Sequence, residues 1–166
     1  MTYLALGSNL GDRLANLQRA RDLLSPFSTK TIVSAPIYET DPLDCPSGSP
    51  PFLNTVLALE TSLSPTELLQ KTQTIESELG RESLSTRTLN SPRPIDIDLI
   101  LVGDTVLATA ELTLPHPRFH ERLFVLHPLR DLAPALIPPT HANPVSILLE
   151  IVKTNELPPQ IFQENW

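Results

Sequence analysis

The order in which strand-like and helix-like segments alternate is the feature that most constrains the fold of this chain. Short apolar runs typical of strands cover residues 2–6, 31–38, 52–59 and 95–102. Helical patterns lie in the first and third gaps between these runs. The resulting order, β-α-β-β-α-β, is that of the ferredoxin-like plan. We therefore predict an α+β fold with a ferredoxin-like βαββαβ core, a short additional strand near 105–107 and C-terminal helices.

The helices of this plan have clear start and stop signals. Asp12 precedes leucines at helical spacing, and Pro26 ends that pattern. Ser64-Pro65-Thr66-Glu67 places an N-cap serine, a first-turn proline and a glutamate at the third position, and Gly80 suits the C-cap. Two further helices are expected over 121–133 and 145–153, followed by an irregular tail. The length of 166 residues fits a single domain over 1–166.

Composition narrows the class of protein. The net charge of −7 argues against non-specific binding to nucleic acid or to anionic membranes, because both need a surplus of Lys and Arg. Cys45 is the only cysteine, so an intramolecular disulfide is excluded. We find neither a signal-peptide pattern nor an apolar run near the roughly 20 residues of a membrane span. We expect a cytoplasmic monomer that binds neither nucleic acid nor a membrane.

The strongest chemical signal is the segment Ile95–Val102. Alternate residues of a strand share a face, so one face is predicted to hold Ile95, Ile97, Leu99 and Leu101, and the other Asp96, Asp98, Ile100 and Val102. Two adjacent carboxylates on a face that becomes apolar indicate the edge of a cleft. A pair of Mg²⁺ ions would relieve their repulsion. The alternative is a strand whose first residues point two aspartates at water.

Arginines gather on both sides of these aspartates. Five of them stand at positions 81, 87, 93, 118 and 122. Arginine binds phosphate in a bidentate manner, so the cluster, the aspartates and His116 together favour a site for Mg²⁺-polyphosphate. Ordinary solvated or ion-paired arginines are the alternative. The long loops 39–51 and 81–94, rich in proline or arginine, are interpreted as lids over this site.

Two other patterns carry less weight. The segment Gly7–Gly11 follows a strand and precedes a helix, but it matches neither nucleotide-binding glycine fingerprint, so a tight turn is the favoured interpretation. His116 and His120 stand four apart as in a zinc site, but Pro117 separates them and the required glutamate is missing.

Five segments, in order along nearly the whole chain, resemble one family. They are Tyr3–Asp12, Thr40–Leu43, Phe52–Asn54, Pro92–Leu99 and Leu114–Arg122. The family is that of the 6-hydroxymethyl-7,8-dihydropterin pyrophosphokinases of folate biosynthesis, and the P-R-x-x-D-x-D pattern is its most specific motif here. The resemblance implies transfer of pyrophosphate from ATP, as co-substrate, to the hydroxymethyl group of a reduced pterin. The chain departs from the usual family pattern mainly within the 81–94 loop.

The resemblance also implies roles for individual residues. Asp96 and Asp98 are expected to bind two Mg²⁺ ions and, with Arg81 and Arg93, to support catalysis. The residues expected on the ATP side are Gln73, Glu76, Arg87, Leu99, Thr113, His116 and Arg122. Those expected on the pterin side are Thr40, Pro42, Leu43, Phe52, Asn54 and Phe124, with the two phenylalanines as aromatic plates around the bicycle.

Two rival functions stay open from the sequence. A ferredoxin-like domain also serves as an RNA-binding module, although the net charge weighs against it. A D-x-D pair also suits a metal-dependent nucleotidyl or glycosyl transferase. Release of AMP from ATP would separate the pyrophosphokinase from these rivals.

Overall fold

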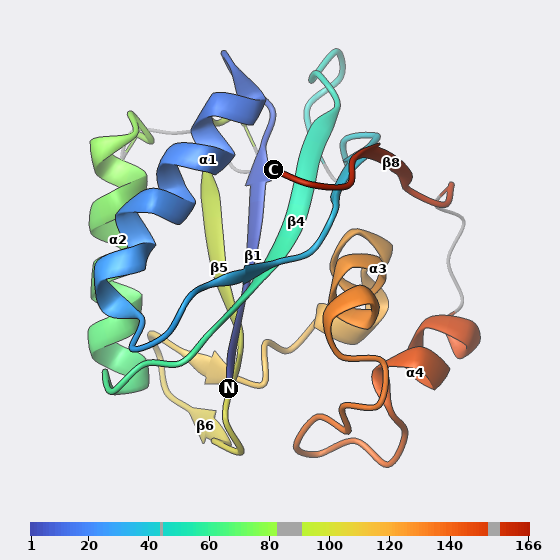
Figure 1. Ribbon diagram of the computed structural model, residues 1–166. Helices are drawn as coiled ribbons and strands as arrows, with labels where there is room; N and C mark the ends of the chain where they lie inside the picture. Colours follow the sequence, from blue (N-terminus) through green and yellow to red (C-terminus); the bar gives the residue numbers. More distant parts are fainter. Residues whose placement is uncertain (44, 83–90, 153–156) are drawn as a thin grey trace.

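A six-stranded antiparallel sheet forms the centre of the molecule (Figure 1). The computed structural model describes residues 1–43, 45–82, 91–152 and 157–166. The strands of the sheet are β1 Thr2–Ser8, β2 Val33–Ser34, β3 Ile37–Thr40, β4 Phe52–Leu59, β5 Asp96–Val102 and β8 Gln160–Gln163. Their order is β5-β1-β4-β3-β8, with β2 also paired to β4. The predicted α+β class and the ferredoxin-like order of elements are confirmed.

Helices cover both faces of this sheet (Figure 1). They are α1 Arg13–Leu24, α2 Pro65–Glu78, α3 Leu123–Leu132 and α4 Val145–Ile151, with 3-10 turns at Ser25–Phe27 and Phe119–Glu121. The helices α1 and α2 pack on one face, and α3 and α4 on the other. Within the described ranges, these helices include none with the length and apolar character needed to cross a bilayer.

The start signals of the helices act as the sequence predicts. The Asp12 carboxylate accepts a hydrogen bond from the backbone N–H of Ala15 and caps α1. Ser64 and Glu67 form a reciprocal capping box at the start of α2. After α2, Gly80 has a φ of 88°, a left-handed conformation that glycine adopts at little cost. These local interactions determine where both helices begin and where α2 ends.

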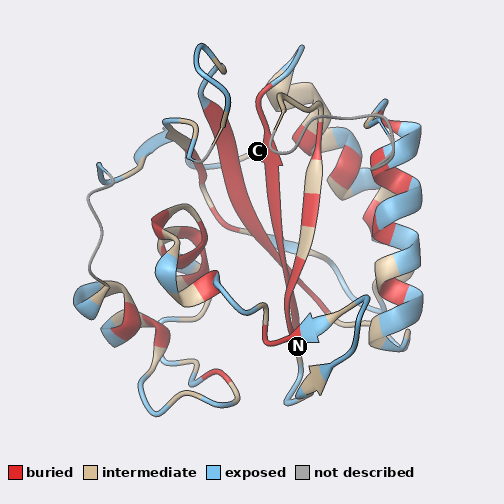
Figure 2. Cartoon of the chain, turned by 180° about the vertical axis from the view of Figure 1, so that it is seen from behind, coloured by how far each residue is buried: buried red, intermediate tan, exposed pale blue. Residues whose placement is uncertain are grey.

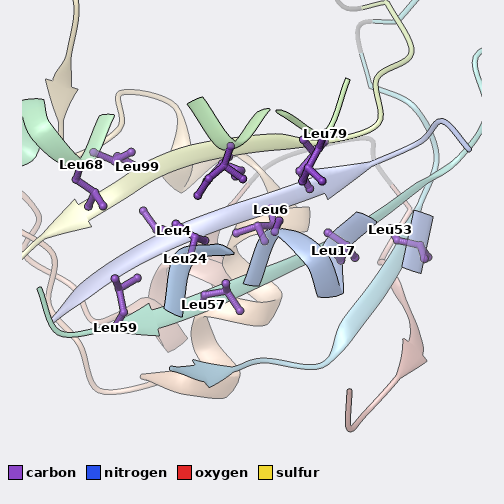
Figure 3. Packing of buried hydrophobic residues seen from close by; sticks show 14 of the residues in the cluster. Leu4, Leu6, Leu17, Leu24, Leu53, Leu57, Leu59, Leu68, Leu79 and Leu99 are labelled. Carbon is purple, nitrogen blue, oxygen red and sulfur yellow. The ribbon is translucent and has the colours of Figure 1, made fainter. Parts of the chain in front are cut away.

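Two hydrophobic cores lie on the two sides of the sheet, and the central strands are buried along most of their length (Figure 2). The core under α1 and α2 is rich in leucine, including Leu4, Leu6 and Leu99 (Figure 3). The core under α3 and α4 includes Val56 and Ile100. Burial on both faces explains why the strands read as nearly continuous apolar runs.

Several boundaries differ from the prediction. The expected strand over 31–38 is two strands, β2 and β3, because Pro36 has no N–H to donate to a ladder. The short extra strand is Leu107–Ala108 (β6), paired with Thr113–Leu114 (β7). The tail is not irregular, since β8 pairs with β3 and extends the sheet. The helix expected to reach 153 ends at Ile151, and residue 153 lies outside the described residues.

A β-bulge in β5 corrects the predicted faces of that strand. Leu4 pairs with Leu99 and Tyr3 pairs with Leu101, so Ile100 is an extra residue. Leu101 therefore packs with Ile100 in the core under α3 and α4, while Val102 packs on the opposite side. The predicted faces of Leu101 and Val102 were wrong for this reason, and those of Asp96 and Asp98, before the bulge, are unaffected.

Candidate active site

The floor of the candidate site lies at one end of the sheet. There the last residues of β1 and β3 lie beside the first residues of β4 and β5. Gly7 near the end of β1 pairs with Asp96 on one side and with Asn54 on the other. Ala5 pairs in the same way with Asp98. Paired residues of neighbouring strands project to the same face, so Asp96, Asp98 and Asn54 share the face that α3 covers. Gly7, which has no side chain, and Ala5, which has a small one, leave room above the sheet at this point.

A cavity of about 260 Å³ lies over this floor. Its walls are formed by Ala5, Leu6, Gly7, Thr40, Asp41, Leu43, Cys45, Phe52, Asn54, Arg81, Ser91, Arg93, Asp96, Asp98, His116, Arg118, Arg122 and Phe124. The structure thus brings together the predicted aspartates, both predicted phenylalanines and four of the five clustered arginines. They come from segments that are far apart in the sequence.

Asp96 is held by two arginines. Arg81 Nη1 lies 2.6 Å from one carboxylate oxygen. Arg93 binds the other oxygen through Nε at 2.9 Å and Nη2 at 2.8 Å. Burial by itself would raise the pKa of Asp96, but the guanidiniums of Arg93 and Arg81 outweigh it and hold the pKa below its usual value. Asp96 is therefore ionised at neutral pH.

Asp98 is in a different electrostatic environment. Arg122 lies beside it, with Nη1 at 3.8 Å from Asp98 Oδ2. Loss of solvent and the charge of Asp96 raise the pKa of Asp98 to about 6, and Arg122 opposes that shift. A cation that approached Asp98 would therefore stabilise its charged form.

Glu76 supports Arg81 from behind. This buried side chain on α2 accepts a hydrogen bond from the Ile97 backbone N–H at 2.7 Å and pairs with Arg81. Burial raises the pKa of Glu76 to about 7; Arg81 opposes this shift and Asp96 adds to it. Glu76 does not line the cavity. The structure places it between α2, β5 and Arg81, where it orients the arginine.

His116 presents a neutral imidazole to the cavity. Its backbone N–H donates to the carbonyl of Ile100, the bulge residue, at 2.9 Å. Its Nδ1 accepts from the Arg118 backbone N–H at 3.2 Å, which assigns the ring proton to Nε2. Burial, with the charges of Arg122 and Arg118, lowers the pKa of His116 to about 4. His116 is thus a neutral hydrogen-bond donor.

Each cavity phenylalanine has an arginine over its ring. The Arg93 guanidinium carbon is 5.1 Å from the Phe52 ring centre, and that of Arg122 is 5.4 Å from the ring of Phe124. On the same cavity wall, Asn54 donates its amide N–H to Thr40 Oγ1 at 2.7 Å. Each aromatic ring of the cavity thus has a cationic group beside it.

Some predicted site residues lie outside the cavity walls. Pro42 stands between two lining residues, and Gln73 on α2 and Thr113 on β7 are exposed. Arg87, with the rest of 83–90, lies outside the described residues. The Leu99 side chain is buried under α1 and α2. A contact from Leu99 to a nucleotide would therefore use its backbone.

The backbone of Leu99 is suitably placed for such a contact. The Ile97 N–H points away from β1, toward Glu76. In an antiparallel pair, residues two apart direct their N–H and C=O groups to the same side. Leu99 thus directs its own backbone groups to the outer side of β5, which is the last strand of the sheet order.

Sequence reasoning missed six lining residues, and it placed Arg118 in the arginine cluster without assigning it an individual contact. The missed residues are Ala5, Leu6, Gly7, Asp41, Cys45 and Ser91. A Cβ atom on Gly7 would stand 2.8 Å from Asn54 Oδ1 and 3.5 Å from Phe52 Cδ1. The need for glycine there depends on strand register, which the sequence does not reveal. The glycine after a strand was the only available signal.

The carboxylate pair fits Mg²⁺. Among the described residues, no group of three or more His, Cys, Asp or Glu side chains lies close enough to hold a metal by itself. Mg²⁺ binds with one or two carboxylates and completes its shell with water and substrate phosphates. Asp96 and Asp98, both on the cavity wall, supply that donor set.

An arginine-walled cavity around two carboxylates is typical of the phosphate-transferring class of enzymes. A family model described as 7,8-dihydro-6-hydroxymethylpterin-pyrophosphokinase (HPPK) matches residues 3–134, and the chain belongs to this family. The resemblance predicted from sequence motifs is confirmed. The chain is thus an enzyme of the pyrophosphokinase family of folate biosynthesis.

Individual relatives agree with this assignment. The chain is 44% identical over 134 residues to the 2-amino-4-hydroxy-6-hydroxymethyldihydropteridine pyrophosphokinase of Bacillus subtilis, covering 80% of this chain and 77% of that protein. It is 39% identical over 151 residues to the folic acid synthesis protein fol1 of Schizosaccharomyces pombe, covering 90% of this chain but 20% of that one.

A solved structure shows the same fold. The crystal structure of Plasmodium falciparum HPPK-DHPS wild type with pterin and p-hydroxybenzoate matches with a TM-score of 0.70 and 16% identity, over 90% of this chain and 41% of that one. The chain therefore spans less than half of the Plasmodium and fission yeast proteins, and most of the bacterial one.

Proposed function

We propose that the chain transfers pyrophosphate from ATP to the hydroxymethyl group of 6-hydroxymethyl-7,8-dihydropterin in a Mg²⁺-dependent reaction that releases AMP. One observation carries this proposal. The walls of a single cavity hold an aspartate pair, several arginines and two phenylalanines beside a hydrogen-bonding asparagine. A substrate pair with a polyphosphate and a flat heteroaromatic ring matches both halves of that cavity.

The pterin half is formed by Phe52, Phe124, Asn54 and Thr40. A flat bicyclic ring gains from stacking and from area burial between aromatic side chains. Asn54 is 6% exposed and its amide is oriented by Thr40, so it offers a fixed polar edge for ring hydrogen bonds. Leu43 on the cavity wall and its neighbour Pro42 would close the loop side of the ring.

The polyphosphate half is formed by Arg81, Arg93, Arg122 and His116. Three of these arginines pair with the two aspartates, Arg81 and Arg93 with Asp96 and Arg122 with Asp98. The Nε of Arg81 is a buried donor that lacks a partner among the described residues. An anionic phosphate chain would satisfy this donor and receive the N–H of neutral His116. Arg87, Gln73, Thr113 and the Leu99 backbone remain predictions for the nucleotide side.

Asp96 and Asp98 would hold two Mg²⁺ ions beside the phosphates. When bound, these ions would offset phosphate charge and lower the pKa of the attacking hydroxyl. The chain's own contribution is positioning: Phe52 and Phe124 orient the pterin, while Arg81 and Arg93 orient the phosphate to be transferred. Phosphoryl-type transfer depends mainly on such positioning and on charge stabilisation.

The most direct test is product analysis. The purified chain is incubated with ATP, Mg²⁺ and the reduced pterin, and the nucleotides are separated by chromatography. The proposal requires pterin-dependent formation of AMP and of the pterin diphosphate. Formation of ADP, or unconsumed ATP, would reject it. Omission of Mg²⁺ should abolish turnover if the metal requirement is correct.

Substitution of the second aspartate tests the metal assignment. Asp98→Ala removes a carboxylate whose charge a cation would stabilise, so turnover at saturating ATP should fall at least ~10²-fold, as on loss of one charge-stabilising group. Asp104→Ala, at an exposed position just after β5, is the matched control and should keep wild-type turnover. Near-normal turnover of Asp98→Ala at saturating Mg²⁺ would contradict the two-metal site.

Three broader expectations accompany the proposal. A cytoplasmic location, a monomeric state and a single domain over 1–166 stay predictions from the sequence. Gel filtration with light scattering would test the monomer directly.

A further inference from the structure

One residue of the turn between β1 and α1 contacts both loops that flank the cavity. Asn9 is 1% exposed. Its side-chain Oδ1 accepts from the backbone N–H of Arg93 at 2.8 Å, and its own backbone N–H donates to the Arg93 carbonyl at 3.1 Å. Its Nδ2 donates to the carbonyl of Pro50 at 3.2 Å. A single side chain therefore joins segments that are 41 and 84 residues away from it.

On one side, these hydrogen bonds fix the position of the Arg93 backbone. The Arg93 backbone is bound to Asn9 at both its N–H and its carbonyl, while its guanidinium binds Asp96 and lies over Phe52. The side chain thus spans from Asn9 to the carboxylate pair. A shift of the Arg93 backbone would move the guanidinium relative to both its partners.

On the other side, the hydrogen bond to Pro50 fixes the position of the chain just before β4. Pro50 and Pro51 have no N–H groups, so their backbones can form hydrogen bonds only through their carbonyls. The Pro50 carbonyl accepts from Asn9, and the Pro51 carbonyl accepts from Arg13 Nη1 at 2.8 Å. The next residue is Phe52, on the cavity wall. Asn9 in the turn and Arg13 at the start of α1 therefore hold the two residues directly before this aromatic ring.

We propose that Asn9 is a positioning residue that holds the two halves of the cavity in a fixed position relative to each other. It fixes Arg93, on the polyphosphate side, relative to Phe52, on the pterin side. This inference rests on the proposed function, because that function assigns the two substrates to these halves. The Asn9 amide supplies the acceptor for the Arg93 N–H and the donor for the Pro50 carbonyl from two different atoms of one planar group.

The turn thus has a role although it lacks a phosphate-binding fingerprint. A misplacement of about 1 Å in a positioning group can lower a rate by ~10²-fold, even when the substituted residue does not touch substrate. Asn9 does not line the cavity, so its effect would pass through Arg93 and Pro50.

Two substitutions separate the two contacts. Asn9→Ala removes both side-chain hydrogen bonds, and we expect kcat to fall at least ~10-fold. Asn9→Asp keeps an acceptor for Arg93 but loses the donor to Pro50, so we expect a smaller change in kcat and a rise of several-fold in the KM for the pterin. Such a split between kcat and KM is not expected from a general loss of stability.

Asn16→Ala, in the first turn of α1 next to this loop, is the matched control. Asn16 donates to the Leu10 carbonyl at 3.0 Å and to Ser8 Oγ at 3.4 Å, and neither bond joins a cavity loop. We expect kcat and both KM values within ~2-fold of wild type. Equal kinetic effects of Asn9→Ala and Asn16→Ala, or wild-type kinetics for Asn9→Ala, would overturn the proposal.

A double-mutant cycle and amide exchange complete the test. In an Arg93→Ala background, Asn9→Ala should lower kcat far less than in wild type, because the residue through which it acts is gone. Hydrogen exchange of the Arg93 amide should be at least ~10-fold faster in Asn9→Ala and unchanged in Asn16→Ala. Additive kinetic effects would overturn the coupling.

The exchange measurement does not depend on activity. If wild type makes no AMP while the Arg93 amide is protected by Asn9, the proposed reaction fails and the structural link stands. If wild type makes AMP but the Asn9 variants keep wild-type kinetics, the reaction stands and the positioning role of Asn9 is rejected.

Discussion

Gly7 shows how much one residue can decide at the site. Its α-carbon faces Asn54 and Phe52 so closely that an added Cβ would stand 2.8 Å from Asn54 Oδ1. Gly7→Ala should therefore displace the asparagine that we assign to the pterin. We expect the KM for the pterin to rise at least ~10-fold with a smaller effect on the KM for ATP, measured by steady-state kinetics.

A second glycine provides the control for this substitution. Gly103, in the turn after β5, has a φ of 52° and no atom within 4 Å of an added Cβ. Gly103→Ala should lower the free energy of unfolding by about 1 kcal/mol through backbone strain, without changing either KM. If Gly7→Ala lowered the free energy of unfolding but left the KM for the pterin unchanged, the close contact with Asn54 would not matter for binding.

His116 provides a residue-scale prediction about pH. Its pKa is lowered to about 4, so the folded state binds fewer protons at this site than the unfolded state between about pH 4 and 6.5. The group therefore lowers stability as the pH falls through that window and has no such effect above it. Imidazole ¹⁵N NMR should show a neutral ring with its proton on Nε2 from pH 8 to 5.

Arg118→Ala is the companion variant for this titration. It removes one of the charges that lower the His116 pKa but keeps the backbone N–H that binds Nδ1. The pKa should move upward while the tautomer stays the same. A wild-type His116 that titrates near its ordinary value would contradict the neutral donor.

At the scale of elements, β5 shows which features of a strand its own sequence determines. The alternation of Ile95 to Leu99 correctly placed Asp96 and Asp98 on one face. It failed at Leu101, because the bulge at Ile100 exists only in the pairing with β1. The bulge also positions His116, through the Ile100 carbonyl. Register with a partner strand is information that a local pattern does not contain.

The helix α2 illustrates the opposite case, in which local sequence is sufficient. Its capping box could be predicted from the sequence because Ser64 and Glu67 are only three residues apart. Ser64→Ala should lower the free energy of unfolding by about 1 kcal/mol in urea denaturation, the usual cost of losing an N-cap. Glu76 lies at the other end of the helix, so kcat should stay at its wild-type value.

The neighbouring Thr66 serves as the comparison for this cap. Thr66→Ala, at an exposed position in the same first turn, should change the free energy of unfolding by less than about 0.5 kcal/mol. A similar loss in both variants would mean that the capping box adds no stability of its own.

At the scale of the whole molecule, the distribution of charge matters more than its sum. The chain has a net charge of −7, yet the cavity walls hold Arg81, Arg93, Arg118 and Arg122 against three aspartates. A net negative protein can thus bind a small polyphosphate locally while it repels long polyanions. The clustering of arginines around the aspartates was visible in the sequence. The buried pairing of Arg81 with Glu76 was not, since it depends on how α2 packs against β5.

The tail is the part of the fold that sequence reasoning missed, because β8 is short and pairs with a strand more than 120 residues earlier. It is joined to the body by Trp166, whose Nε1 donates to the Ala35 carbonyl at 2.8 Å and whose ring lies 4.7 Å from the Arg21 guanidinium. Trp166→Ala should lower the free energy of unfolding by about 2 kcal/mol, less than a fully buried tryptophan, because the residue is only half-buried.

The composition makes this contact measurable, because Trp166 is the only tryptophan in the chain. Its fluorescence in urea should follow the same transition as the far-UV circular dichroism of the whole protein, since β8 is hydrogen-bonded to β3 and unfolds with it. Phe162→Ala, a 46% exposed position on β8, should cost less than about 1 kcal/mol. A fluorescence transition at lower urea than the dichroism would show that the tail separates first, and the sheet would then be stable with β3 as its edge strand.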